Sequence, residues 1–503
     1  MNRKYYGYLF SILNKFYQKV LPFSSIKIYL LQKIIMVICM NKIVKQVKDE
    51  FIECNDLIYK EIKFGFKTYH IFYLETITSS DKVSEYVLNG ISFNKNINNI
   101  KKNLPSPNFV EVNNSDQINY YLCNGYTVVI NKNNIYAIET KADLDRSISE
   151  ATTEPNLFGP KDSLVENIQK NLGLVKRRLK TNHLKNVVKI LGRDTKSIIN
   201  ILYIDNITNM ELVKKISDKL DNIDIDGILD SGMLKNILDN NKNPFPTIKI
   251  TERPDVICSN LLYGKVVILV DGSPFALIMP TFLLDFFNPA SDEYSKSVNV
   301  MFLKILRIIC FTFSIFLPSY YIAITTYNQE TIPLPLLLNF ATQRSGVPFP
   351  PIIEALTMLV ICEILKESDL RFPNSYGSAI SILGALILGE AAVNAGIVSP
   401  IMIIVVAVTF ICSLIFSDSE ISGAIRLWRV IGLTFSTFFG LYGICLAFIA
   451  FLINITSYKS IYLNYTFPIE PNDKSYLKKI VLGKKTNKRS KYLTKNIIRE
   501  KIK

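Results

Sequence analysis

The sequence is poor in the side chains that most often carry catalysis and metal binding. Its 503 residues include two histidines, His70 and His183, and one tryptophan. So few imidazoles leave almost no material for a histidine-based metal site or a catalytic triad. The eight cysteines contain no CxxC pair, and half of them lie in apolar stretches, where cysteine behaves as a small hydrophobic residue. We therefore expect neither a disulfide framework nor a zinc site.

Motifs of known enzyme classes are also missing. The sequence has no GxSxG and no HExxH motif. Residues 384–389 have the first glycine spacing of a phosphate-binding loop, but Glu390 stands where that loop needs lysine. A basic cluster at 176–180, on a predicted helix, favours a solvated face over a ligand site. We expect no enzyme activity, no catalytic residue, no cofactor and no bound metal.

Charge is distributed unevenly along the chain. The net charge is +15, and residues 457–503 hold 13 Lys and Arg against 3 Asp and Glu, a net of +10. This basic tail follows directly on an apolar region, so it is expected to meet anionic lipid headgroups and to stay cytoplasmic. Binding to nucleic acid is disfavoured, because no stacking platform accompanies the basic residues.

Long apolar runs fill residues 299–456 and predict an all-α, multi-pass transmembrane domain. The runs lie near 302–326, 349–366, 377–397, 399–416 and 430–456. The last run is long enough that it must tilt or extend beyond the lipid core. Residues 332–340 are bracketed by prolines and too short to span, which suits a re-entrant or interfacial piece.

The residues leave two alternatives for the number of membrane crossings. A soluble front without an export signal and a basic tail are both expected on the cytoplasmic side. They therefore need an even number of crossings, whereas five good runs are present. Either the proline-bracketed piece also crosses, or one of the runs does not. Residues 304 and 307, both basic, begin the first run and are expected to reach the headgroups.

An internal repeat marks the region before the apolar runs. Residues 71–78, IFYLETIT, recur as ILYIDNIT at 201–208, and the glycine-led strand at 125–131 resembles 264–271. Because the two pairs occur in the same order, duplication is the preferred explanation. We predict two tandem, related α/β subdomains at 50–145 and 185–298, joined by a helical linker at 146–184. Residues 1–49 are expected to form a variable extension.

Three glutamates lie inside apolar runs: Glu354, Glu363 and Glu390. A charge at the centre of a spanning helix costs about 2.5–3.5 kcal/mol on insertion scales, so it normally faces a pore, a partner charge or water. Glu354 shares a helix face with Met358 and Ile361, and this face is the candidate lining of an ion conduit. The alternative is that Glu354 bonds to a neighbouring helix.

Glu363 lies half a helical rotation away from Glu354. Its position near the end of the run, close to Lys366 and Arg371, predicts an interfacial ion pair. The next run carries small residues at a spacing of three to four, which places them on one helix face and predicts a surface for close helix packing. Glu390 lies beside this stripe as a polar contact. The stripe comprises Gly377, Ser381, Ala385, Gly389, Ala392 and Gly396.

Several motif-like segments occur in a fixed order along the chain. In the soluble part they are the sequences at 154–167, 224–232, 244–246, 251–255 and 270–275. In the apolar part they are the sequences at 317–318, 332–335, 346–350, 354–355 and 396–400. Together these segments resemble the GerA-type spore germination proteins, A-subunit class. The likeness is dense over 150–456 and loose over 50–145.

The resemblance implies a function that the residues alone do not show. It implies a subunit of a nutrient germinant receptor in the spore inner membrane, working with a transporter-like B-type subunit and a lipoprotein C-type subunit. Such A subunits are proposed to form homo-oligomers, surrounded by membrane lipids, that conduct ions. The resemblance supplies no catalytic motif and no ligand site.

Two other classes of protein are the alternatives to a receptor subunit. A secondary transporter of a small solute usually shows inverted repeats within its membrane part. Here the repeat lies in the soluble part, which argues against a transporter. A membrane-anchored enzyme is disfavoured because no catalytic constellation is found.

Overall fold

The computed structural model describes residues 40, 42–64, 67–89, 108–112, 115–131, 134–143, 151, 153–154, 159–239, 243–371, 389–416, 418–473, 477, 490 and 492–494. The chain divides into two compact units. The first comprises Met1–Ser147 and Leu172–Val187, and the second comprises Ile148–Asn171 and Val188–Lys503.

The first unit is built on a five-stranded antiparallel sheet with the order β1-β2-β4-β5-β3. Alternate residues of β2 point to opposite faces, as a strand requires. Phe72 belongs to the core on one face, whereas Ile71 and Tyr73 belong to the core on the other. Helix α6 (Ser115–Cys123) packs against β4. The strands are β1 (Leu57–Phe64), β2 (Lys67–Leu74), β3 (Phe109–Val112), β4 (Tyr126–Asn131) and β5 (Asn134–Glu139).

A second five-stranded sheet has the equivalent order, β6-β7-β9-β10-β8. The repeated sequences occupy equivalent strands: the first pair falls on β2 and β7, and the second pair on β4 and β9. The two sheets therefore share one topology, as the internal repeat predicts. The strands are β6 (Leu184–Leu191), β7 (Ser197–Ile204), β8 (Lys249–Thr251), β9 (Val266–Val270) and β10 (Ala276–Met279).

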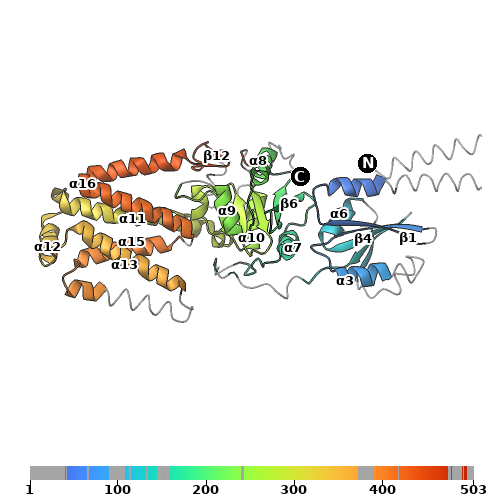
Figure 1. Ribbon diagram of the computed structural model, residues 1–503, viewed down its shortest axis with the longest axis horizontal. Helices are drawn as coiled ribbons and strands as arrows, with labels where there is room; N and C mark the ends of the chain where they lie inside the picture. Colours follow the sequence, from blue (N-terminus) through green and yellow to red (C-terminus); the bar gives the residue numbers. More distant parts are fainter. Residues whose placement is uncertain are drawn as a thin grey trace, which may run out of the picture. The chain divides into compact units, whose positions relative to one another are not determined.

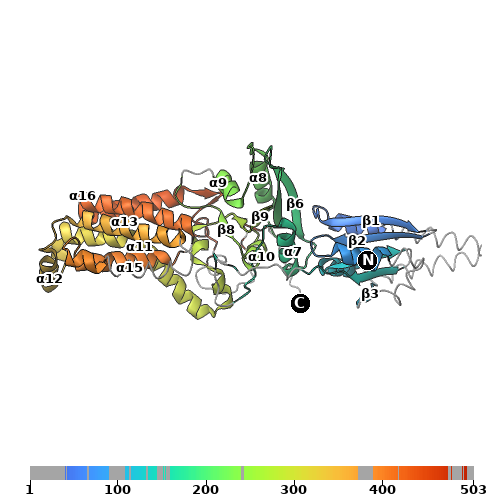
Figure 2. The same ribbon diagram turned by 60° about the horizontal axis from the view of Figure 1, so that its bottom comes forward.

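Three helices accompany the second sheet (Figures 1 and 2). They are α8 (Met210–Asp221), α9 (Ser231–Asp239) and α10 (Pro254–Leu262). Asn209 caps α8 by accepting a hydrogen bond from the Glu211 N–H. The apolar residues of α8 recur every three to four positions and are buried, so the helix covers the sheet with one face. A turn at Asp271-Gly272 joins β9 and β10, with Gly272 at a φ of 82°.

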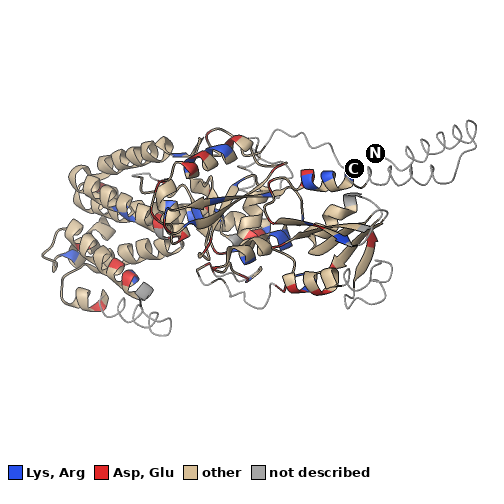
Figure 3. Cartoon of the chain, turned by 45° about the vertical axis from the view of Figure 1, so that its right-hand side comes forward, with Lys and Arg blue, Asp and Glu red and all other residues tan. Residues whose placement is uncertain are grey.

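The C-terminal part of the second unit is helical. It consists of α11 (Ser297–Thr326), the short α12 (Leu334–Arg344), α13 (Pro351–Arg371), α15 (Pro400–Leu414) and α16 (Ser419–Ser457). Charged residues are sparse on these helices (Figure 3). Within the described ranges two helices are long and apolar enough to cross a membrane, Ser297–Thr326 and Glu420–Ser457, while α15 is apolar but shorter.

Helix α16 is a hairpin rather than one rod. Residues 428 and 451 would be about 35 Å apart along a straight α-helix. The rings of Trp428 and Phe451 nevertheless lie 5.3 Å apart. The reversal occurs at Gly440, whose φ of 58° and ψ of −137° are open to glycine but strained for other residues. The prediction of a single long run at 430–456 that tilts or overshoots was therefore wrong.

Two further expectations change in the structure. The linker at 146–184, predicted to be helical, holds α7 at Ile168–Arg178, and β6 begins at its last residue, Leu184. Lys176, assigned by its neighbours to a solvated face, is buried instead. Its ammonium group lies 2.5 and 2.6 Å from the two carboxylate oxygens of Asp56. That partner lies 120 positions earlier in the chain, so no local pattern could have indicated it.

Candidate functional site

The two ends of hairpin α16 are held by the second α/β subdomain, and this junction is the candidate functional site. At the start of the hairpin, Lys235 of α9 forms an ion pair of 2.6 Å with Glu420. The Lys235 side chain is 4% exposed and that of Glu420 is 37% exposed. Asp418 caps the helix beside this pair by accepting from the Glu420 N–H at 2.9 Å. Because the lysine is buried, its charge depends on the carboxylate for compensation.

The end of the hairpin is fixed by hydrogen bonds to the same subdomain. The Ser460 hydroxyl donates to the Thr247 carbonyl at 3.0 Å and accepts from the Thr281 N–H at 3.1 Å. The Leu283 N–H donates to the Tyr465 carbonyl at 3.2 Å. Residues 247 and 281 adjoin β8 and β10, so a serine just after the hairpin ties it to the edge of the sheet.

An aromatic cluster lies between these two attachments. Phe245, 1% exposed, lies 6.1 Å from the Phe451 ring and 6.3 Å from the Tyr465 ring, measured between centroids. Phe287 meets Phe311 of α11 edge-on at 5.3 Å. Edge-to-face aromatic packing is directional, so these rings fix orientation as well as distance. Phe245 and Phe287, which lie outside the strands of the sheet, therefore belong to one apolar cluster with residues of α11 and α16.

A buried ion pair stabilises the segment that leads from the sheet to α11. The Lys265 ammonium lies 2.6 Å from Asp285, and Asp285 also accepts from the Phe282 N–H at 3.0 Å. Burial lowers the pKa of Lys265, and the attraction of Asp285 opposes that shift. Asp285 therefore stabilises this segment in two ways. Its charge attracts Lys265, and its side chain accepts the hydrogen bond from the Phe282 N–H.

The N-terminal part of α11 is also held in place by polar contacts of Arg307. Arg307 donates to Asp292 at 2.6 and 3.0 Å and to the Phe287 carbonyl at 3.1 Å. The sequence predicted that residues 304 and 307 reach lipid headgroups. For Arg307 the structure shows a two-pronged pair with a carboxylate instead, a geometry that suits the planar guanidinium. The Lys304 side chain is buried.

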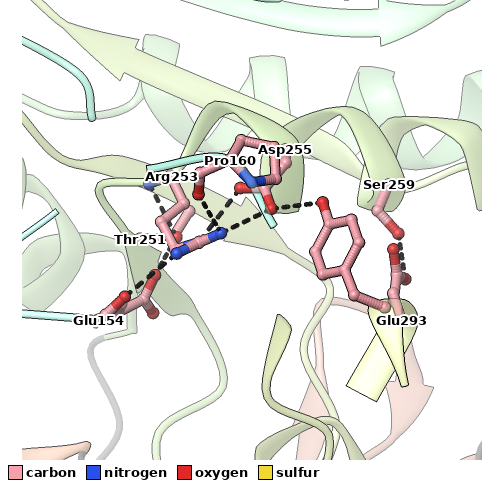
Figure 4. A network of polar contacts seen from close by, with 8 residues as sticks. Glu154, Pro160, Thr251, Arg253, Asp255, Ser259 and Glu293 are labelled. Atoms are coloured by element: carbon pink, nitrogen blue, oxygen red, sulfur yellow. Dashed lines mark hydrogen bonds and ion pairs between the residues drawn. The ribbon is translucent and has the colours of Figure 1, made fainter. Parts of the chain in front are cut away.

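Arg253 organises a second polar network (Figure 4). It is 1% exposed, and it donates to Asp255 at 3.1 and 2.8 Å. It also donates to the backbone carbonyls of Glu154 at 3.2 Å and Pro160 at 2.9 Å. The side chain of Glu154 accepts from the Thr251 hydroxyl at 2.6 Å. Two of the segments that carried the family resemblance, 154–167 and 251–255, are thus held together by one guanidinium.

The Arg253 network continues to the loop that precedes α11. The Tyr294 hydroxyl donates to Asp255 at 2.7 Å, and the Ser259 hydroxyl donates to Glu293 at 2.6 Å. Burial raises the pKa of Glu154, and the nearby Lys249 opposes that shift. The network therefore joins a buried carboxyl group to the connection between sheet and helices.

Glu354 is buried among the helices, at 1% exposed. One carboxylate oxygen accepts from both the N–H and the hydroxyl of Ser399, each at 2.9 Å. The other oxygen lies 3.8 Å from the Arg344 side chain. Ser399 precedes α15, so the glutamate of α13 satisfies the start of a neighbouring helix. This is the contact that the sequence offered as the alternative to lining a conduit.

The other members of the proposed conduit face pack inside the chain. Met358, 6% exposed, belongs to an apolar cluster between α11, α13 and α15, and Ile361 packs against that cluster. Their role in an ion path stays a prediction. Glu363 does form an ion pair, with Arg426 of α16 at 2.9 Å and Arg429 at 4.0 Å, and the side chain of Arg371 lies outside the described residues.

The predicted small-residue stripe is only partly described. Gly377, Ser381 and Ala385 lie outside the described residues. A Cβ at Gly389 would lie 3.9 Å from Ile403 of α15, an ordinary packing distance. Gly396 lies in a turn with a φ of 65°, beyond the helical residues. Glu390 is exposed in this chain, and the packing role of the stripe stays a prediction.

Sequence reasoning did not single out Lys235, Glu420 or Ser460. Each is an ordinary polar residue whose partner is remote in the chain, so no spacing marks it. Within the described ranges no group of three or more His, Cys, Asp or Glu side chains is placed to hold a metal ion. The junction offers ion pairs and aromatic packing between the subdomain and the helices.

Comparisons with known proteins agree on one family. The model of the Bacillus/Clostridium GerA spore germination protein family matches residues 45–492. The chain is 34% identical over 443 residues to spore germination protein KA of Bacillus subtilis (strain 168), covering 86% of this chain and 81% of that protein. It is 35% identical over 449 residues to spore germination protein GerLA of Bacillus cereus, covering 86% and 90%.

One solved structure is also similar. It is the crystal structure of the N-terminal domain of the A subunit of the Bacillus megaterium spore germinant receptor GerK3, with 28% identity. The match covers 47% of this chain and 92% of that domain, with a TM-score of 0.36. At that score the family assignment rests on the sequence relatives. From the family match over most of its length, this chain belongs to the GerA spore germination protein family.

Proposed function

We propose that the chain is a membrane-embedded subunit of a spore nutrient germinant receptor and that it relays nutrient binding from partner subunits to its helices. Family membership supports the germination role, since the relatives are spore germination proteins. B-type and C-type receptor subunits are the partners that follow from that role. The spore inner membrane is the corresponding location.

The observation that carries the relay is the double attachment of α16. The Lys235–Glu420 pair holds one end of the hairpin, and the bonds of Ser460 hold the other. Both α9 and the sheet edge belong to the second subdomain. A displacement of that subdomain would therefore act on both helical arms of the hairpin, through Lys235 at one end and Ser460 at the other. Packed interfaces of this kind change between discrete arrangements rather than bending continuously.

The break at Gly440 supports a multi-pass arrangement with both soluble ends on one side. The five apolar runs become six if the last one crosses twice, which gives the even number that the topology needs. In agreement with this, residues 459–465 return to the subdomain from which α11 departs. We propose that this side is the cytoplasm and that lipid covers the exposed apolar faces of the helices.

The proposal includes assembly into a homo-oligomer that conducts ions. Glu354, Met358 and Ile361 remain the candidate lining, together with the packing stripe that includes Gly389. Glu354 would reach such a path only by exchanging its bond to Ser399 for another partner. That exchange would couple the movement of helices to the appearance of a charge.

The test is germination of spores in which this chain is the only receptor subunit of its type. Deletion is expected to abolish the response to nutrient while germination by a treatment that bypasses receptors persists. The variant K235M should impair the nutrient response, whereas K214M, an exposed lysine on α8, should leave it unchanged. An unchanged nutrient response after deletion would refute the receptor role. Equal responses of K235M and K214M would refute the relay through α16.

A further inference from the structure

The C-terminal segment around Leu493 occupies a specific place on the second subdomain. The Leu493 carbonyl accepts from the N–H of Asn209, the cap of α8, at 3.1 Å. Thr494 forms an antiparallel bridge with Thr208. Leu493 itself is fully buried, in a cluster with Phe282 and Phe467.

The first subdomain has the same contacts, made by a different segment. There the N–H of Ser79, the cap of α3 (Ser80–Lys82), donates to the Thr140 carbonyl at 2.8 Å. Thr78 forms an antiparallel bridge with Lys141. Residues 78–79 are the sequence counterparts of residues 208–209. Residues 140–141 directly follow β5, so this subdomain fills the place with its own continuation.

The glycines opposite the two segments agree with this equivalence. Gly125 and Gly264 both have positive φ, 80° and 89°. A Cβ on Gly125 would lie 2.9 Å from the Lys141 side chain, and one on Gly264 would lie 2.9 Å from that of Thr494. Only glycine permits both this conformation and this close approach. The sequence repeat therefore preserves a slot for an extended segment in each subdomain.

The second subdomain cannot fill its slot in the same way. Tyr126 follows Gly125 and lies opposite Glu139, whereas Lys265 follows Gly264. Because Val266 lies opposite Met279, Lys265 lies one step further along, opposite Pro280, so Pro280 is equivalent to Glu139 and Thr281 is equivalent to Thr140. The Thr140 N–H donates to the Gly125 carbonyl at 3.3 Å, whereas the Thr281 N–H has other acceptors.

The chain after Pro280 turns away toward the helices. The Thr281 N–H bonds to Thr247 and Ser460 instead, and the connection continues to α11. The slot beside Asn209 and Gly264 is thereby left for another part of the chain.

We infer that the second subdomain carries a slot for an extended segment and that this chain's own residues Leu493–Thr494 complete it, in the place that Thr140–Lys141 take in the first subdomain. Addition of a remote extended segment is a known way of completing a sheet protein. The Tyr462 hydroxyl donates to the Tyr492 carbonyl at 3.0 Å, and residue 462 lies shortly after the hairpin, just past β11 (Lys459–Ser460). The segment thus fastens the end of α16 to the subdomain.

A cysteine pair at the bridge tests the inference in the full-length chain. In detergent-solubilised protein, T208C/T494C should form an intrachain disulfide under mild oxidation, since directly paired residues lie within the range that a disulfide spans. The matched control is T78C/T494C, which places a cysteine in the equivalent slot of the first subdomain and should not crosslink. The two single variants set the background from the eight native cysteines.

Two results would overturn the inference. One is the absence of the T208C/T494C crosslink, or equal crosslinking in T78C/T494C. The other is a crosslink between chains when T208C and T494C single variants are mixed, because the occupant would then be the tail of a second copy.

Hydrogen exchange gives a second measurement that does not depend on engineered thiols. The variant L493D should increase the exchange rate of the Asn209 amide at least several-fold, because its acceptor departs. The Ser79 amide of the first subdomain should exchange at an unchanged rate and serves as the internal control. An unchanged rate at Asn209, or equal acceleration at both amides, would contradict the assignment.

Discussion

Lys235 and Glu420 form an ion pair of 2.6 Å between the second α/β subdomain and the first turn of hairpin α16. The two residues lie on elements far apart in sequence, and the pair is a direct electrostatic contact between α9 and that hairpin.

Removal of the carboxylate should destabilise the chain more than removal of the lysine. E420Q leaves a buried ammonium without its counter-charge, whereas K235M replaces that ammonium by an apolar side chain. Because Glu420 is partly exposed, we expect a loss of about 1–3 kcal/mol for E420Q and less for K235M. Denaturant unfolding of the solubilised chain measures both, and a larger loss for K235M would contradict this reasoning.

Gly440 should not tolerate a side chain. In G440A a Cβ would lie 2.9 Å from Tyr327 and 3.0 Å from Asn328, on a backbone strained for alanine. A cost of about 1–3 kcal/mol is expected from the backbone conformation alone. The control is G423A in the same helix, where an added Cβ meets nothing within 4 Å. Thermal unfolding should separate the two variants, and similar midpoints would argue against a sharp reversal at residue 440.

Two variants of Glu354 distinguish a structural role of this residue from a role in lining an ion path. E354Q keeps an oxygen that accepts from Ser399, so folding and assembly should persist. E354A leaves the Ser399 N–H and hydroxyl without their acceptor and should destabilise the chain by about 1–3 kcal/mol. Cation release from germinating spores is the readout. Altered release in E354Q with normal chain abundance supports the conduit, while normal release leaves Glu354 with its structural contact alone.

Arg253 should resist replacement by lysine. R253K keeps the charge but cannot donate simultaneously to both oxygens of Asp255 and to the carbonyls of Glu154 and Pro160. A loss of about 3–5 kcal/mol is expected for breaking a buried, multiply bonded pair. R193K, at an exposed arginine paired with Asp224, is the matched control and should change stability far less, because exposed ion pairs contribute little. Comparable losses in the two variants would show that the Arg253 network contributes little.

Glu154 should make the stability of the folded chain depend on pH, and the direction of its pKa shift fixes the direction of that dependence. Burial raises its pKa above the ordinary value of 4.5, so the folded state binds the proton more tightly than the unfolded state. Its contribution to stability is therefore fully present below pH 4.5 and is lost as pH rises through the folded pKa. E154Q should remove this part of the pH dependence. Melting curves at several pH values test it, and parallel curves for the two proteins would exclude Glu154 as the source.

Local patterns predicted the sheets well but not their remote contacts. The repeated strands were visible because alternating apolar residues and turn residues are short-range signals. Lys176 was misread because its basic neighbours suggest solvent, while Asp56 lies 120 positions away. The reversal at Gly440 was missed because a single glycine is tolerated in an apolar helical run.

The junction could not have been predicted from spacing. Lys235, Glu420 and Ser460 are positioned by the packing of separate elements, and nothing in their neighbours marks them. By contrast, the segments around Glu154 and Arg253 stood out as motifs, and the structure shows that they bond to each other.

The hydrogen bond from Asn209 to Leu493 joins residues separated by more than half the chain. Synthesis proceeds from the N-terminus, so the slot beside Asn209 emerges long before the segment that fills it. The first subdomain can close while the chain is still being made, whereas the second must wait until every helix has followed. A chain broken off within the helices would carry one finished and one open subdomain. Its open slot would distinguish an incomplete copy from a complete one.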